Sequence, residues 1–211
     1  KRFSVLKKMT SLLPKDPHCG LIIGATACGK TEFVLELLET YYLKHFDNIV
    51  IFCPTIKYNK TYIQHKFIWT DDNVFVVDPN GKLSEHLEYF RHVFEDTGNN
   101  LFIIDDCSAE KDIVKKREAL SKLAFSGRHA GIYVWVLSQK YNSVLKDFRE
   151  QLKWVCLFFC KDRDSYDICL KENDVVDSKE RRNELKEQLK CTPHAKLILK
   201  TAQPTGYKIL T

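Results

Sequence analysis

The chain has 211 residues, 44% of them hydrophobic, and a formal net charge of +5. This length and composition suit one domain with a sizeable core, and the mild positive charge permits an acidic partner without requiring one. The longest apolar stretches, such as WVCLFFC at 154–160, are too short to span a bilayer, and the N-terminal KRFSVLKKMT lacks the apolar core of a signal peptide. We therefore expect a soluble protein without a membrane partner.

The first predicted strand, residues 19–23, runs into GATACGKT at 24–31, which fits the pattern G-x-x-x-x-G-K-[ST]. A loop of this kind binds phosphate with its backbone amides and with the N-terminus of the helix that follows. Apolar residues at helical spacing predict that helix over 32–43. We expect the phosphates of a nucleotide to be bound by Gly24, Ala25, Thr26, Ala27, Cys28, Gly29, Lys30, Thr31 and Glu32.

The eight cysteines are better interpreted as reduced thiols than as a disulfide scaffold. Cys53, Cys156 and Cys160 lie in apolar runs, and the sequence has no C-x-x-C pair. Cys28 lies inside the phosphate loop, where a positive field could lower its pKa and make the thiol reactive. The alternative, a small side chain that fills space, stays open.

Further apolar runs follow at 48–54, 74–79, 101–106, 132–139 and 154–159, and amphipathic segments separate them. Strands of this kind that alternate with helices predict a mostly parallel sheet with helices on both faces. The tail AKLILKTAQPTGYKIL at 195–210 predicts two strands joined by a Pro-Gly turn, at an antiparallel edge of the sheet. The expected fold class is therefore α/β.

Polar residues end two of these strands. Asp105 follows LFII, where a phosphate-loop protein holds Mg²⁺ through water, together with the Thr31 hydroxyl. Asp106 would orient or deprotonate the water that attacks the terminal phosphate, although two acids at a strand end also occur in a simple turn. The next strand ends in Ser138 and Gln139 at the same rim, where the amide of Gln139 could donate to the γ-phosphate and accept from the attacking water.

Together these elements resemble the FtsK-HerA class of P-loop ATPases. Within that class the chain resembles the poxvirus-type DNA-packaging ATPases of large DNA viruses, virophages and Polinton-type transposons, roughly over residues 18–160. GATACGKT resembles the Walker A loop, and LFIIDD resembles Walker B, with Asp105 as metal residue and Asp106 as catalytic acid. Many members of the class have Glu where this chain has Asp106.

The same resemblance assigns three further residues. Gln139 matches the sensor residue, and Arg128 in SGRHAG is a candidate arginine finger that acts on a neighbouring subunit. Arg149 in KDFREQLKW is the rival candidate, because it also follows the sensor strand.

The resemblance implies one RecA-like ATPase domain over 1–211, with a core at about 18–160 and C-terminal helices and a hairpin at about 161–211. It implies ATP and Mg²⁺, a ring of five or six subunits, and movement of double-stranded DNA into a capsid, with capsid or procapsid proteins as partners. The place of action would be the cytoplasm, viral factory or nucleus of an infected cell. For DNA contacts we favour Lys111, Lys115 and Lys122, which share one face if their segment is helical.

Other classes of protein share part of this pattern. A nucleoside or small-molecule kinase has the same loop and sheet, but would not need two aspartates together with a strand-end glutamine. A switch protein that binds ATP without turnover is the second alternative. A GTPase is disfavoured, because the only NK dipeptide is followed by Thr61 and Tyr62, with no aspartate to recognise guanine.

Overall fold

The computed structural model describes residues 12–42, 44–107 and 113–211. The chain forms two compact units. One unit comprises the described residues up to Lys15, Gly20–Lys30 and Ser138–Thr211, and the other comprises Asp16–Cys19 and Thr31–Leu137.

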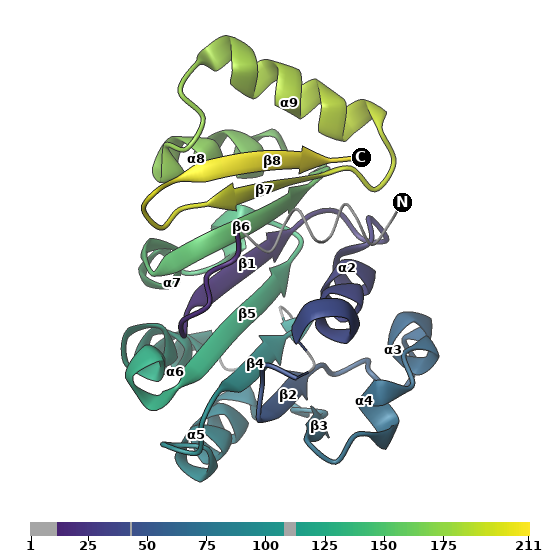
Figure 1. Cartoon of the computed structure of the whole chain (residues 1–211), viewed down its shortest axis with the longest axis vertical. Helices are drawn as coiled ribbons and strands as arrows, with labels where there is room; N and C mark the ends of the chain where they lie inside the picture. The colour runs from purple at the N-terminus through teal and green to yellow at the C-terminus, as the bar shows by residue number, and fades with distance from the viewer. Residues whose placement is uncertain (1–11, 43, 108–112) are drawn as a thin grey trace. The chain divides into compact units, whose positions relative to one another are not determined.

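The unit that contains Thr31–Leu137 is built on four strands in the order β3 (Val74–Val77), β2 (Asn48–Phe52), β4 (Asn100–Ile104) and β5 (Ile132–Ser138). Every pair of neighbours in this order is parallel, with Ile51 opposite Ile103 and Ile103 opposite Trp135 (Figure 1). All residues of β4 are buried. The near-continuous apolar runs thus form the parallel strands predicted from them, because side chains on both faces are removed from water.

The helices of this unit connect the strands. They include α3 (Lys60–Gln64), α4 (Phe67–Thr70), α5 (Leu83–Val93), α6 (Ile113–Ser126) and the short 3₁₀ helix η3 (Gly127–Ala130). Helices α5 and α6 pack against each other, and Lys122 of α6 forms an exposed ion pair with Glu88 of α5 at 3.8 Å. Lys115 also lies within α6, whereas Lys111 lies outside the described residues.

The helix after the phosphate loop differs from the prediction at both ends. Helix α2 (Lys30–Leu37) begins two residues earlier than expected, and a π-helical turn, η1 (Leu38–Tyr42), follows it. The Thr40 hydroxyl donates to the Glu36 carbonyl. A threonine hydroxyl that bonds to the carbonyl four residues back slightly destabilises and bends a helix. Leu43 lies outside the described residues.

The unit that contains Ser138–Thr211 has the strand order β1 (Cys19–Ile23), β6 (Leu152–Phe158), β7 (Lys196–Lys200) and β8 (Gly206–Leu210). Strand β7 is antiparallel to both of its neighbours, with Ile198 opposite Cys156 and opposite Lys208. The predicted antiparallel C-terminal strands are therefore confirmed.

The two longer helices in this unit begin at side-chain caps. The unit contains η4 (Tyr141–Ser143), α7 (Lys146–Glu150), α8 (Arg163–Asn173) and α9 (Lys179–Cys191). The Asp162 carboxylate accepts the Ser165 amide at the start of α8, and the Ser178 hydroxyl accepts the Arg181 amide at the start of α9. Helix α9 packs on β7. None of the helices in the described part of the chain has the length and apolarity that crossing a bilayer requires.

Candidate active site

The phosphate loop joins β1 to α2 in a conformation that ordinary backbone avoids. Ala27 and Gly29 have φ angles of 61° and 99°, and the Cys28 amide donates to the Ala25 carbonyl at 3.3 Å. The Lys30 ammonium donates to the carbonyls of Gly24 at 2.8 Å and Ala25 at 3.0 Å. A tight loop that leads into a helix N-terminus, with a lysine held against it, is a site for phosphate groups.

Two glycines of this loop are required for different reasons. A Cβ atom at Gly24 would lie 2.6 Å from the Cys28 sulfur and 2.6 Å from Phe158 Cβ. At Gly29 the positive φ itself disfavours any other residue. The sequence pattern therefore corresponds to a real steric requirement at both positions.

Cys28 fills the space next to Gly24. Burial raises the pKa of its thiol, and the nearby Lys30 charge opposes this only in part. The thiolate is therefore disfavoured, which supports the space-filling interpretation over a reactive cysteine. All eight cysteines of the chain are free thiols.

The structure brings the two expected metal residues together. The Thr31 hydroxyl donates to Asp105 Oδ2 at 2.9 Å, and Asp105 is only 6% exposed. Its position is set by the sheet, because the Asp105 amide donates to the Phe52 carbonyl at the end of β2, at 2.9 Å. A hydroxyl and a carboxylate are hard oxygen ligands that fit Mg²⁺.

This pair also fits the way a phosphate-loop protein holds its ion. Among the described residues no group of three or more His, Cys, Asp or Glu side chains could hold a metal. Mg²⁺ in such proteins is bound by few protein groups, with water and phosphate oxygens completing its shell. The Thr31–Asp105 pair is sufficient for that arrangement.

Asp106 and Gln139, the expected catalytic acid and sensor, are both exposed. Asp106 has a φ of 54°, in the left-handed region that non-glycine residues rarely adopt and that recurs at functional sites. Gln139 follows Ser138, whose carbonyl accepts the Gly24 amide at 3.2 Å. Gln139 therefore directly follows a residue that is bonded to the first residue of the phosphate loop, within the same unit.

Arg128 lies at the other end of the strands. It is exposed in η3, and Gly131 just after that helix accepts the amide of Asn100, the first residue of β4, at 2.9 Å. Asp105 follows the last residue of the five-residue strand β4, so the two ends are roughly 17 Å apart at about 3.3 Å per residue. Arg128 is not part of the site formed by Thr31 and Asp105 of its own chain.

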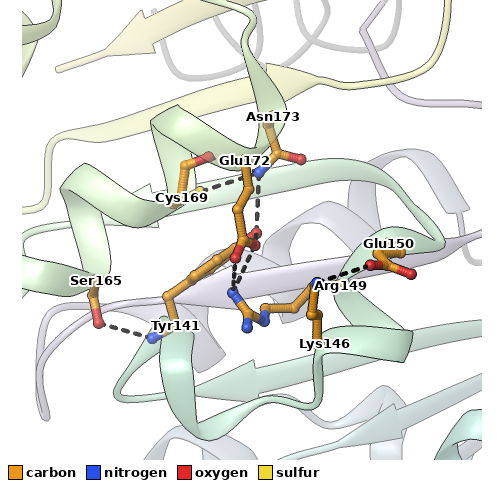
Figure 2. Close-up of polar contacts among 8 residues, drawn as sticks. All are labelled: Tyr141, Lys146, Arg149, Glu150, Ser165, Cys169, Glu172 and Asn173. Atoms are coloured by element: carbon orange, nitrogen blue, oxygen red, sulfur yellow. Dashed lines mark hydrogen bonds and ion pairs between the residues drawn. The ribbon is translucent and has the colours of Figure 1, made fainter.

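Arg149 is engaged within its own unit (Figure 2). One guanidinium nitrogen donates to both carboxylate oxygens of Glu172, at 2.7 and 2.6 Å, and the group lies 4.6 Å from the centre of the Tyr141 ring. The Tyr141 hydroxyl also donates to Glu172, at 2.9 Å, and its amide donates to the Ser165 hydroxyl. These contacts tie η4 and α7 to α8.

Two residues at the site escaped the sequence analysis. Tyr62 donates its hydroxyl to Asp105 Oδ2 at 2.8 Å, and His194 Nδ1 lies 3.0 Å from the carbonyl oxygen of Cys28. They are separated from their partners by 43 and 166 positions. Neither belongs to a motif, so a single sequence holds no signal that could have found them.

Fold and site together define the class of this protein. A mostly parallel sheet with flanking helices and C-terminal antiparallel strands, a glycine-rich loop that leads into Lys30 and Thr31, and a strand-end acid bonded to that threonine are the features of a P-loop NTPase. Within this class, the chain belongs to the poxvirus A32 protein family, whose model matches residues 7–196.

Solved structures with a similar fold include two viral proteins. The genome packaging NTPase B204 from Sulfolobus turreted icosahedral virus 2, in complex with AMPPCP, has a TM-score of 0.64 and 16% identity, over 94% of this chain and 99% of that one. The DNA-packaging ATPase B204 from Sulfolobus Turreted Icosahedral Virus has a TM-score of 0.63 and 17% identity, over 94% of this chain and 98% of that one.

A bacterial secretion protein shares the fold as well. The cytoplasmic domain of the Type VII secretion ATPase EccC from Thermomonospora curvata has a TM-score of 0.61 and 16% identity, over 90% of this chain and 25% of that one. At such identities the similarity shows the fold alone. No curated protein sequence matches the chain significantly.

Proposed function

We propose that this chain is an ATP-hydrolysing motor that moves double-stranded DNA into a viral capsid. The observation that carries the proposal is the bond from Thr31 to Asp105, which joins the two protein groups of an Mg²⁺ site directly after a phosphate loop. Membership of the poxvirus A32 family and the similarity to the packaging NTPase B204 support the link to genome packaging.

The loop binds the phosphates of ATP. Its amides and the N-terminus of α2 hold the β- and γ-phosphates of ATP, and Lys30 neutralises their charge. Thr31 and, through water, Asp105 would hold Mg²⁺, which when bound supplies further positive charge to the same phosphate oxygens. The Lys30 ammonium reaches the phosphates by leaving the carbonyls of Gly24 and Ala25.

Hydrolysis needs a water molecule in line with the terminal phosphate. Asp106 orients that water and accepts its proton, and its exposure next to Asp105 supports this role. Gln139 contacts the γ-phosphate and the water from the end of β5. Arg128 supplies positive charge to the active site of an adjacent subunit in a ring of five or six.

The motor tracks DNA through its phosphates and does not read bases. Lys122, together with Lys115 and Lys111, is our candidate for these contacts; the Lys122 side chain is half-exposed and forms a surface ion pair with Glu88. Capsid or procapsid proteins are the expected docking partners, in the cytoplasm, viral factory or nucleus of an infected cell.

Nucleotide turnover is tested by phosphate release and nucleotide binding in three variants. We expect Lys30→Ala to abolish binding, and Asp106→Asn to bind ATP but to lower turnover at least about 100-fold, because the acid acts only on the attacking water. Lys57→Ala, which removes an exposed lysine, is the control and should match the wild type. Near-normal hydrolysis by Asp106→Asn would refute its assigned role. Phosphate transfer to an added nucleoside would favour a kinase.

DNA movement is tested by duplex binding at several salt concentrations. We expect affinity that is independent of sequence and falls steeply with salt, because binding releases counterions from the phosphates. Replacement of Lys115 and Lys122 by alanine should reduce the slope of log affinity against log salt concentration by about two, because two fewer phosphates are neutralised. Absence of duplex affinity at low salt in the assembled, nucleotide-bound protein, or phosphate release that DNA does not stimulate, would favour a switch protein over a DNA motor.

A further inference from the structure

A tyrosine in the segment after β2 bonds to the aspartate that is proposed to serve the metal. Tyr62 of α3 is 1% exposed, and its hydroxyl donates to Asp105 Oδ2 at 2.8 Å. The same oxygen accepts the Thr31 hydroxyl at 2.9 Å. One carboxylate oxygen therefore receives two hydroxyl donors from segments far apart in the sequence.

These two bonds restrict the orientation of the carboxylate. Asp105 can rotate about its side-chain bond only if it breaks a hydrogen bond to the hydroxyl of Tyr62, which is buried and would lose its acceptor. Thr31 alone would leave the Asp105 carboxylate freer to rotate. The Thr31 hydroxyl is itself expected to bind the metal, so its contacts change when the metal arrives and it cannot serve as a fixed support. Tyr62 is the donor that does not belong to the phosphate loop.

Hydrogen bonds before and after Tyr62 in the chain fix the short helix α3 that carries it. The Trp69 indole donates to the Tyr62 carbonyl at 3.0 Å, and the Asn59 side chain caps α3 by accepting the Thr61 amide at 3.0 Å. His65, one turn further on, lies 3.3 Å from Glu32 and 3.1 Å from Glu39, both in the helical segment that follows the phosphate loop. Residues 59–69 therefore connect that segment to the aspartate at the end of β4.

We propose that Tyr62 is a positioning residue for the Mg²⁺ site: it fixes the Asp105 carboxylate so that the site is formed before the metal–nucleotide complex arrives. The proposal rests on the proposed function, because it assumes that Asp105 serves the metal. Preorganisation of this kind raises affinity for the metal complex without a new contact to the nucleotide.

Tyr62→Phe isolates the hydroxyl, since it keeps the ring and its packing. The measurement is binding of a fluorescent, non-hydrolysable ATP analogue, titrated with Mg²⁺ and repeated in excess chelator. We expect the Mg²⁺ concentration at half-saturation to rise about tenfold, in the range that one hydrogen bond to a charged group contributes. Affinity in chelator should stay within about twofold, because the loop and Lys30 are unchanged. Mn²⁺ binding followed by electron paramagnetic resonance should weaken in parallel.

Tyr58→Phe is the matched control. Tyr58 lies just before α3 and is 85% exposed, so the same chemical change occurs nearby without contact to Asp105. It should leave the Mg²⁺ titration unchanged. A double variant separates an effect through Asp105 from a general loss of stability. When Tyr62→Phe is added to Asp105→Asn, we expect no further change in the Mg²⁺ titration, because Tyr62 acts through that carboxylate.

Several outcomes would overturn the proposal. Wild-type Mg²⁺ half-saturation in Tyr62→Phe, or an equal loss of affinity with and without metal, would leave Tyr62 with a structural role only. A full additional effect in the Asp105→Asn background would show that it does not act through Asp105. If the wild-type protein binds no nucleotide in either condition, the proposed function fails, and the role of Tyr62 fails with it.

Discussion

At the scale of single residues, a buried histidine shows how strongly the core selects one protonation state. His18 is 3% exposed; its Nδ1 donates to the Asp16 carbonyl at 2.8 Å, and its Nε2 accepts the Trp135 indole N–H at 3.1 Å. Only the neutral ring can make both bonds, since the protonated ring has no acceptor. Burial lowers the pKa of His18 from 6.5 to about 4.

This histidine predicts a specific pH dependence of stability. Between pH 6.5 and about 4 the unfolded chain binds a proton at His18 and the folded chain does not, so stability falls as the pH falls, by about 3 kcal/mol in total. Below pH 4 both states are protonated and this loss stops. Urea denaturation from pH 7 to pH 4 should show this loss in the wild type relative to His18→Gln, which cannot titrate. Parallel curves for the two proteins would contradict the assignment.

At the scale of elements, the turn between α9 and β7 supports the phosphate loop. Nδ1 of His194 lies 3.0 Å from the Cys28 carbonyl oxygen, which can only accept, so the ring donates. Because the peptide is planar and trans, fixing the Cys28 carbonyl also fixes the opposite direction of the Gly29 N–H. The C-terminal strands thereby orient one of the amides that the phosphates require.

We expect His194→Gly to weaken the binding of both ATP and inorganic tripolyphosphate by about 2- to 10-fold, the range of one neutral hydrogen bond. Glycine is the appropriate change because His194 has a φ of 60°, which would strain alanine. His194→Asn is the matched control, because asparagine tolerates this φ and places an N–H at the same distance from the backbone. Calorimetric titration of both ligands measures the effect. A loss of affinity for ATP but not for tripolyphosphate would instead indicate that His194 contacts the nucleoside.

At the scale of the whole molecule, two arginines compete for the role of a finger. Arg128 is exposed and remote from Asp105 of its own chain, whereas the Arg149 side chain is 11% exposed and already bonded to Glu172. A residue that acts on a neighbouring subunit must be able to leave its own surface. We therefore predict that Arg128 serves activity and that Arg149 serves stability.

Mixing of variants tests this assignment. Arg128→Ala should lower turnover by about 10³- to 10⁵-fold, and a blend with Lys30→Ala should recover part of it, since some interfaces then combine an intact loop with an intact finger. Arg149→Ala should instead lower stability by about 1–2 kcal/mol, because it leaves Glu172 without its charged partner. Phosphate release and thermal unfolding measure the two effects. Complementation by Arg149→Ala but not by Arg128→Ala, in rings shown to be mixed, would reverse the roles.

Much of this molecule was predictable from local patterns. The apolar runs at 48–54, 101–106 and 132–139 became β2, β4 and β5 because a strand buried on both faces needs a nearly continuous apolar sequence. The helix after the loop was predicted less well. Its last turn has π geometry, and the helical spacing of apolar residues does not reveal where a regular α-helix gives way to a π-helical turn.

The sequence by itself determined the phosphate loop, because that site is made of consecutive backbone amides, two required glycines and a helix N-terminus. It also indicated Asp105, since a strand-end acid in a parallel sheet lies at the same edge as the loop. Only the tertiary structure decided that Tyr62 holds Asp105, that His194 reaches Cys28 and that Arg149 is occupied by Glu172. These are contacts between side chains and distant segments, and they depend on how strands and helices pack, which no local pattern of residues specifies.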